Sequence, residues 1–275
     1  MKICAGIVLY NPDVAKLNEN IMAIAPQVDE VILVDNTPGG VSGNIVKYEN
    51  IHVIHNKKNY GIGKALNQIC RFADRRGYGW YITLDQDSVC DRELVEQYKR
   101  YLDNHIGQLT CNITDRHLGR IEKYAYKTDV IEDIESCITS GCINNVKAVK
   151  RIGGYDESMF IDGVDIDISL RLKQKGYKLL RLNYDGLIHS LGDGKQINIL
   201  GKKLSFTRHA PWRNYYMRRN FIYIARKYYK GLEKYKKVFR QIVYGIGTIL
   251  MEDKKLERLK FNTKGVIEGI RRPIK

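Results

Sequence analysis

The stretch Trp80-Tyr81-Ile82-Thr83-Leu84-Asp85-Gln86-Asp87-Ser88 decides the fold class and points to the chemistry. Its first five residues predict a buried strand, and two carboxylates follow where the strand ends. Mg²⁺ commonly binds through one or two carboxylates plus the phosphate oxygens of a substrate. Open α/β folds bind ligands beyond the carboxyl ends of their strands. The stretch therefore indicates a metal site for a diphosphate, although a D-x-D pair alone also fits a turn or a helix cap.

The neighbouring segments alternate between strand and helix patterns. Apolar runs predict strands at residues 3–9, 31–34 and 51–54, and helical spacing predicts helices at 14–25 and 62–76. Strands of this kind separated by helices predict a mostly parallel sheet that is covered on both faces. Residues 106–135 are polar and irregular, so we expect a loop region there with one weak strand.

The composition is that of an ordinary globular protein. The chain has 275 residues, of which 44% are hydrophobic and 28% charged. The opening apolar run breaks at Asn11-Pro12 and reads as a first strand rather than a signal peptide. Six cysteines show no C-x-x-C pairing, which favours buried thiols in a reducing cytoplasm over zinc or disulfide roles.

Charge is concentrated at one end of the chain. The net charge is +15, and residues 201–275 hold 21 Lys and Arg against 5 Asp and Glu. Such asymmetry indicates contact with an anionic surface, either nucleic acid or membrane. From Leu232 onward, apolar residues recur at helical spacing beside basic ones. This amphipathic helix fits a membrane interface or packing on the body equally well, but the uncharged run 241–251 is shorter than the about 20 residues that span a bilayer.

Two further motifs follow predicted strands. Asp35 precedes a turn-rich loop, where its carboxylate can bind a uracil or thymine N–H or a ribose hydroxyl, or else cap the turn. Gly61 and Gly63 open a predicted helix, so the backbone there can approach a phosphate closely. A dinucleotide fingerprint would need glycine where Leu66 stands, which disfavours a Rossmann dehydrogenase.

Acidic residues gather around a later helix start. Asp162, Asp165 and Asp167 fall within six residues, more than helix capping requires, and one of them can serve as a general base. His189 follows an apolar segment and precedes a Gly-rich turn. It fits a structural hydrogen bond or a metal or phosphate contact.

Five motifs occur in one order along the chain: Leu9-Tyr10-Asn11-Pro12, Val34-Asp35-Asn36, Asn59-x-Gly61-x-Gly63-x-Ala65-Leu66-Asn67, Asp85-Gln86-Asp87-Ser88 and Phe160-Ile161-Asp162-x-Val164-Asp165-Ile166. Together with Pro211–Asn220 they resemble family-2 glycosyltransferases of the GT-A fold, and within these the bacterial rhamnosyltransferase branch. The resemblance covers about residues 1–225. It implies a Rossmann-like, mostly parallel sheet flanked by helices, with residues 226–275 as a basic, amphipathic helical extension.

The resemblance also implies a role for individual residues. Asp35 would bind the nucleobase, and Asp165 would be the general base. Val164 stands where many members have Glu, so Asp162 is the other candidate for the base. The remaining assignments are as follows: Asp85, Asp87 and His189 on a divalent metal, Mg²⁺ or Mn²⁺; Tyr10, Asn59, Gly61, Lys64, Asp85, Asp87, Arg218 and Arg219 on the donor; Asp162 and Tyr215 on the acceptor side.

The activity implied by the resemblance is an inverting, metal-dependent transfer from a nucleoside diphosphate sugar, dTDP-L-rhamnose first. The expected acceptor is a polyprenyl-diphosphate-linked or other glycan of polysaccharide or O-antigen synthesis. The enzyme would act in the cytoplasm, peripherally on the inner face of the plasma membrane. Alternatives are UDP-sugar donors (galactofuranosyl, glucosyl or N-acetylhexosaminyl transfer) and an inactive scaffold. A nucleic-acid-binding module would use the basic tail but leave the acidic set without purpose, so we expect no nucleic-acid partner.

Overall fold

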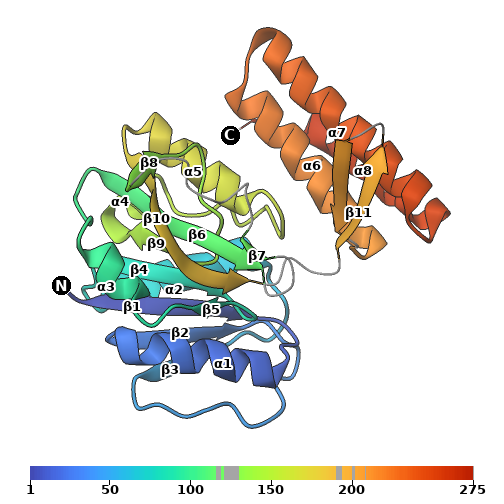
Figure 1. Ribbon diagram of the computed structural model, residues 1–275. Helices are drawn as coiled ribbons and strands as arrows, with labels where there is room; N and C mark the ends of the chain where they lie inside the picture. The colour runs from blue at the N-terminus through green and yellow to red at the C-terminus, as the bar shows by residue number, and fades with distance from the viewer. Residues whose placement is uncertain (116–118, 121–129, 190–193, 200–201, 208, 275) are drawn as a thin grey trace. The chain divides into compact units, whose positions relative to one another are not determined.

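A computed structural model describes residues 1–115, 119–120, 130–189, 194–199, 202–207 and 209–274 (Figure 1). The chain forms two compact units. The N-terminal unit comprises Met1–Ser158 and Val164–Ser190, and the C-terminal unit comprises Met159–Gly163 and Leu191–Lys275. The expected boundary after residue 225 differs from this division, because it falls inside helix α6 (Pro211–Tyr228), which packs against a later helix of the C-terminal unit.

One mixed sheet forms the centre of the N-terminal unit, in the order β3-β2-β1-β4-β9-β6-β10-β5. Strands β1 to β4 run parallel, β9 is antiparallel to its neighbours β4 and β6, and β10 is parallel to β6. The strands are β1 (Ile3–Leu9), β2 (Glu30–Asp35), β3 (Ile51–His55), β4 (Trp80–Asp85), β5 (Val89–Cys90), β6 (Ile106–Asp115), β7 (Gly119–Arg120), β8 (Ile131–Asp133), β9 (Cys142–Asn145) and β10 (Lys178–His189). The predicted mostly parallel α/β sheet is confirmed.

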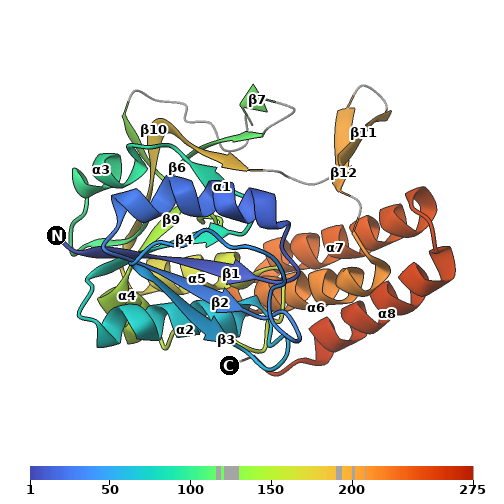
Figure 2. The same cartoon turned by 90° about the horizontal axis from the view of Figure 1, so that it is seen from below.

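Helices cover both faces of this sheet (Figure 2). They are α1 (Val14–Ile24), which continues into a 3₁₀ turn (Ala25–Gln27), α2 (Ile62–Arg75), α3 (Leu94–Lys99), α4 (Val146–Arg151) and α5 (Val164–Gln174). Alternate residues of β1, from Ile3 to Leu9, join Leu17 and Ile21 of α1 in the main core. On the other face Gly6 meets α2 so closely that a Cβ would lie 2.4 Å from Cγ2 of Ile69. Successive side chains of β1 point to opposite faces of the sheet, and both faces are buried.

The expectation of a loop region with one weak strand was wrong for residues 106–115. They form β6, a ten-residue strand that is almost wholly buried. Two of its buried polar side chains have partners within the fold: Gln108 donates to Asn144 at 2.9 Å and accepts from the Ser169 hydroxyl at 2.7 Å, and Asn112 donates to Asn183 at 3.1 Å. Buried polar groups that find partners cost little. The strand therefore lacks the apolar run by which its neighbours can be recognised.

The C-terminal unit contains a hairpin, β11 (Gly194–Ile199) with β12 (Lys202–Thr207), and three helices: α6, α7 (Gly231–Met251) and α8 (Lys255–Arg271). Helices α6 and α8 approach closely at two glycines. A Cβ on Gly265 would lie 2.5 Å from the carbonyl oxygen of Tyr215, and one on Gly269 would lie 2.9 Å from that of Arg219. The contacts advance in the same direction along both helices, so α6 and α8 run parallel. The expected helices of residues 226–275 are present.

All six cysteines are buried and unpaired, as expected. Burial raises the pKa of Cys70 to about 11 and that of Cys90 and Cys111 to about 12. These thiols are therefore protonated at neutral pH. Among the described residues, no helix is long and apolar enough to cross a membrane.

Candidate active site

The end of β1 is fastened to the loop that follows β4. The side-chain amide of Gln86 accepts a hydrogen bond from the backbone N–H of Tyr10 at 2.8 Å and donates one to the carbonyl of Tyr10 at 3.2 Å. The aromatic side chain of Tyr10 is exposed beside this junction. Sequence analysis assigned no role to Gln86, although its place between two aspartates was a usable signal. This pair fixes the loop that carries Asp85 and Asp87.

Asp35, at the end of β2, shapes the loop that follows it. The carboxylate is buried and accepts hydrogen bonds from the N–H of Thr37 (2.8 Å) and of Val41 (3.0 Å), with Nδ1 of His55 at 3.2 Å. Turn capping, the alternative reading of this residue, is therefore part of its role. An ionised carboxylate offers about four acceptor positions. Three of them are used by these contacts, and the contact with a nucleobase stays a prediction.

The amino-terminal end of α2 combines a glycine cap with a nearby lysine. Gly61 caps the helix with φ at 83°, in the region that favours glycine, and its N–H donates to the Asn59 side chain at 2.8 Å. The ammonium group of Lys64 lies 3.9 Å from the centre of the Tyr60 ring. Backbone N–H groups and a lysine at one helix end favour phosphate. Asn36 links this end to the loop after β2 by donating to the carbonyl of Gly61 at 3.3 Å.

The two-residue strand β5 brings His189 to the D-Q-D-S loop. It pairs antiparallel with β10, with Val89 opposite Ile188, and so places the end of β10 beside Asp87. Nδ1 of His189 lies 4.0 Å from Oδ1 of Asp87. Asp85 ends β4, and its backbone N–H donates to the Ser140 hydroxyl at 3.0 Å. Asp87 and His189, two of the three predicted metal ligands, thus lie together. The third, Asp85, is two positions from Asp87 in the chain.

A chain of two buried hydroxyls leads to the imidazole of His189. Its Nδ1 lies 2.7 Å from the hydroxyl of Ser88, which in turn accepts a hydrogen bond from the hydroxyl of Ser140 at 2.7 Å. Both serines are fully buried. No pattern in the sequence points to Ser140, since 52 residues separate it from Ser88. The chain of hydrogen bonds orients the ring toward the loop that carries Asp87.

A divalent metal limits how far apart its ligands can lie. A Mg²⁺ ion lies about 2.1 Å from each ligand, so two ligands of one ion are separated by at most about 4.2 Å. Oδ1 of Asp87 lies 4.0 Å from Nδ1 of His189, but this nitrogen is hydrogen-bonded to Ser88, so a metal ion would take Nε2 of the same ring. Within the described ranges, no group of three or more His, Cys, Asp or Glu side chains could hold a metal ion. Carboxylate oxygens and an imidazole nitrogen are ligand types that Mg²⁺ or Mn²⁺ accepts, and their binding of a metal stays a prediction.

The acidic residues at the start of α5 differ in their surroundings. Asp167 is buried and pairs with Arg171, whose Nη2 lies 2.7 Å from Oδ2. Asp165 is half-buried at the second position of the helix, where its Oδ1 accepts from the N–H of Ile166 at 2.9 Å. Asp167 therefore serves the structure, because its partner on the same helix also donates to the carbonyl of Ile152 at 2.9 Å.

Asp162 lies in the C-terminal unit and is held by helix α6. Its backbone adopts φ of 65°, which is uncommon for a residue with a side chain. Arg213 donates to both carboxylate oxygens, from Nη2 to Oδ1 at 2.8 Å and from Nε to Oδ2 at 2.9 Å. The side chain of Asn220 donates to the carbonyls of Ile161 (2.8 Å) and Asp162 (2.7 Å). Four hydrogen bonds from α6 thus fix this segment.

Three other predicted residues lie within the helical bundle of the C-terminal unit. Arg218 is buried and donates to the carbonyl of Gln241 at 2.7 Å, and burial lowers the pKa of its guanidinium to about 10. Arg219 lies over the rings of Tyr215 and Tyr216, at 5.2 and 4.9 Å from their centres. The hydroxyl of Tyr215 donates to Glu268. These contacts favour structural roles for Arg218 and Arg219, and their contact with a diphosphate stays a prediction.

Known proteins resemble this chain in sequence and in fold. The model of the family "Glycosyl transferase family 2" matches residues 4–153. The chain is 28% identical over 294 aligned residues to the dTDP-rhamnosyl transferase RfbF of Shigella flexneri, covering 98% of this chain and 95% of that protein.

Solved structures show the same fold at low identity. S. aureus TarS 1–349 matches with a TM-score of 0.62 and 13% identity, over 98% of this chain and 81% of that one, and it has also been solved with UDP-GlcNAc. GalNAc-T7 with UDP, GalNAc and Mn²⁺ matches with a TM-score of 0.59 and 14% identity, over 99% of this chain and 56% of that one. The chain spans 44% of a longer TarS chain. These neighbours are GT-A glycosyltransferases. The family model covers more than half of the chain, which therefore belongs to glycosyl transferase family 2.

Proposed function

We propose that this glycosyltransferase moves L-rhamnose from dTDP-L-rhamnose to a glycan hydroxyl with inversion at the anomeric carbon. The similarity to a dTDP-rhamnosyl transferase over almost the whole of both chains is the observation that carries the choice of donor. The donor site would lie at the carboxyl edge of β1 to β4. Asp35 would receive the thymine N–H, and the ribose would lie on the Asp85 side.

The diphosphate would be held from two directions. On one side are the N–H groups at the start of α2 and the ammonium of Lys64. On the other side, Asp87 and His189, with Asp85, would hold Mg²⁺ or Mn²⁺, which would neutralise charge on the leaving diphosphate. The position of the His189 ring beside Asp87 supports this assignment, as does the Mn²⁺ in the structurally similar GalNAc-T7.

Asp165 would take the proton from the attacking acceptor hydroxyl, and one displacement would then invert the anomeric centre. The contacts of the neighbouring carboxylates support this choice. Asp162 is bound through both oxygens by Arg213, and Asp167 is paired with Arg171. Asp162 would instead keep the acceptor-side segment in shape, next to the bundle that carries Tyr215.

The acceptor would be a glycan on a polyprenyl diphosphate in polysaccharide or O-antigen synthesis, so the enzyme would act in the cytoplasm at the inner leaflet of the plasma membrane. The basic C-terminal quarter of the chain supports this site of action. A UDP-sugar donor is the second candidate, and the related TarS complex with UDP-GlcNAc is the observation that favours it.

The reaction is tested with purified full-length protein, Mn²⁺ and a panel of dTDP-, UDP- and GDP-sugars, with release of the nucleoside diphosphate in the presence of mixed lipid-linked glycans as the readout. The proposal expects dTDP-L-rhamnose to be consumed and the product linkage to have the opposite anomeric configuration by NMR. Retention of configuration would exclude a single displacement, and turnover of a UDP-sugar alone would exclude rhamnosyl transfer.

A further inference from the structure

Helix α7 carries a row of exposed apolar side chains along its whole length. The members are separated by three or four residues and therefore lie on one side of the helix. Their exposed fractions run from 49 to 69%, and they are Leu232, Tyr235, Phe239, Val243, Ile246 and Leu250. At 1.5 Å per residue the row is about 27 Å long. A contiguous apolar surface of this kind usually marks a site of interaction.

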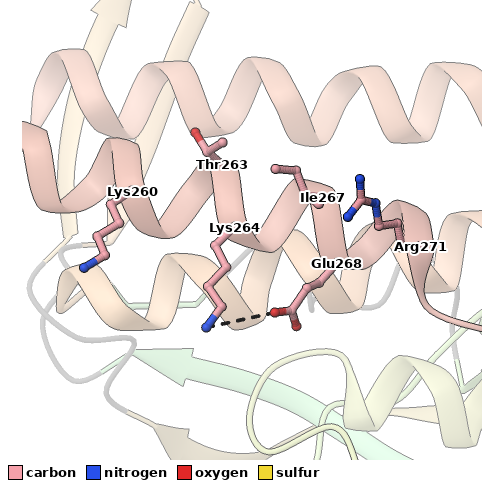
Figure 3. A pocket seen from close by; sticks show the side chains of 6 residues that line it. All are labelled: Lys260, Thr263, Lys264, Ile267, Glu268 and Arg271. Carbon is pink, nitrogen blue, oxygen red and sulfur yellow. Dashed lines mark ion pairs between the residues drawn. The ribbon is translucent and has the colours of Figure 1, made fainter.

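Helix α8 also carries four exposed apolar residues on one side, in two pairs that are separated by about two turns: Leu256 and Leu259, then Ile267 and Ile270. Basic residues border this second row. Lys260, Lys264 and Arg271 line a hollow of about 540 Å³ along the helix, together with Thr263, Ile267 and Glu268 (Figure 3). Only one carboxylate lies among them, Glu268, whose oxygen is 4.0 Å from the ammonium of Lys264.

The row on α7 has a basic border as well. Lys236 and Arg240 are exposed and, at 100° per residue, lie next to the apolar row. The rings of Tyr235 and Tyr244 have cations over them, Lys234 at 4.6 Å and Arg240 at 5.4 Å. Tyrosine and long basic side chains are the residues that place an apolar body in lipid and a polar tip in the headgroups.

We propose that these two rows with their basic borders form a docking face that lies on an anionic lipid bilayer, with α7 in the plane of the interface. We call the set the docking face: the apolar residues of both rows plus Lys236, Arg240, Lys260, Lys264 and Arg271. The inference deepens the proposed function, on which it rests, by naming the surface that would hold the enzyme near a lipid-linked acceptor.

The positive charge of the C-terminal quarter favours a bilayer over a second copy of the chain as the partner of the docking face. Residues 201–275 hold 21 basic against 5 acidic residues, so a second copy on the docking face would bring two strongly positive surfaces together. Lipid phosphates neutralise the same charge, and each Lys or Arg near an anionic surface contributes about 1 kcal/mol. An interfacial helix buries its apolar side by about 5–10 Å at the headgroup boundary. The anionic bilayer therefore satisfies both the apolar rows and their borders.

The docking face is separate from the side by which α7 joins the bundle. Gly245, on the buried side of α7, meets Asn262 of α8, whose Oδ1 would lie 3.0 Å from a Cβ at that position. Thr248, also on that side, accepts hydrogen bonds from the side chains of Asn214 (3.3 Å) and Asn262 (3.2 Å). Substitutions in the exposed rows therefore leave the packing of the three helices in place, which allows a clean test.

The test is flotation of the full-length protein with vesicles of phosphatidylcholine alone, or of equal parts phosphatidylcholine and phosphatidylglycerol. The wild type is expected to float with the anionic vesicles and to be released by salt. The double variant Phe239→Ser/Ile246→Ser should bind about tenfold more weakly or worse, because burying such a side chain is worth about 1.5–3 kcal/mol. Lys236→Gln/Arg240→Gln should weaken binding about tenfold or more and reduce its salt dependence.

Matched controls lie on the N-terminal unit: Met22→Ser removes an exposed apolar side chain, and Lys175→Gln removes an exposed charge. Both should float as the wild type does. Equal flotation of all variants, or no wild-type flotation at low salt, would overturn the proposal. So would a dimer in analytical ultracentrifugation that Phe239→Ser/Ile246→Ser dissociates, because the rows would then belong to a second copy.

Donor binding keeps this outcome apart from the proposed function. The docking-face variants should retain the thermal shift that a nucleotide sugar gives the wild type. A protein that floats but is stabilised by no nucleotide sugar would leave the docking face standing and remove the transferase assignment. A protein that binds its donor but floats with no vesicle would support the transferase assignment and overturn the docking face.

Discussion

Arg213 forms a bidentate ion pair with Asp162, with Nη2 2.8 Å from one carboxylate oxygen and Nε 2.9 Å from the other. Fork geometry of this kind adds specificity as well as energy. Asp162 also keeps a left-handed backbone, at φ of 65°, in the segment that leads into α5. The pair distinguishes Asp162, the alternative candidate for the base, from Asp165, to which the resemblance gives that role. Asp162 shapes the segment, and Asp165 is the residue that we propose as the base.

Asp165→Asn is predicted to lower kcat by about 10²–10⁴, the usual contribution of a positioned general base, with little change in donor affinity. Asp162→Asn keeps the base but weakens the ion pair with Arg213, so it should lower the thermal stability of the C-terminal unit more than it lowers kcat. Steady-state release of dTDP and thermal unfolding measure the two effects. An Asp162→Asn enzyme that is inactive beside an active Asp165→Asn enzyme would reverse the assignment.

Removal of the Asp35 side chain should destabilise the N-terminal unit. The carboxylate accepts from two backbone N–H groups in a buried loop, and Asp35→Ala leaves these donors without their partner. A buried unsatisfied donor costs about 1–3 kcal/mol. Urea unfolding gives the value. His55→Gln, which alters the exposed partner of the same carboxylate, should cost well under half as much. Equal midpoints for wild type and Asp35→Ala would contradict the structural role of this residue.

Ser88→Ala should weaken metal binding without touching a ligand. The hydroxyl of Ser88 lies 2.7 Å from Nδ1 of His189 and helps to orient the ring. Loss of a group that orients a metal ligand typically costs 10–100-fold in affinity, about the range we expect here. Titration of free Mn²⁺ by EPR in the presence of dTDP measures it. Ser158→Ala, at an exposed turn, serves as the control. Unchanged Mn²⁺ affinity in both Ser88→Ala and Asp87→Asn would place the metal elsewhere.

The C-terminal unit should lose stability in mild acid because of His209. Burial, aided by the charge of Arg213, lowers the pKa of this imidazole below its ordinary value of 6.5. As pH falls below 6.5, the unfolded chain binds a proton that the folded unit resists, so the free energy of unfolding decreases. Melting curves between about pH 7.5 and about pH 5.5 should show a larger fall for the wild type than for His209→Gln. Parallel curves would rule the effect out.

The sequence predicted β1 to β4 to within two residues, because their apolar runs end at turn residues, and it predicted the acidic and glycine-rich motifs that follow them. It could not predict β6, whose polar side chains find partners such as Asn144 only in the folded sheet. The pairing of Arg213 with Asp162 joins residues 51 positions apart, and no local pattern indicates it. The sequence also does not indicate that Arg218 is buried, because an arginine in a helix usually faces solvent.

The donor assignment is tested most directly by thermal shift with dTDP-L-rhamnose, UDP-GlcNAc and UDP-galactofuranose, each with and without Mn²⁺, on the wild type and on Asp87→Asn. The account predicts that dTDP-L-rhamnose stabilises the wild type most, that the shift needs Mn²⁺, and that Asp87→Asn loses it. A larger, metal-independent shift with a UDP-sugar would contradict both the donor and the metal site.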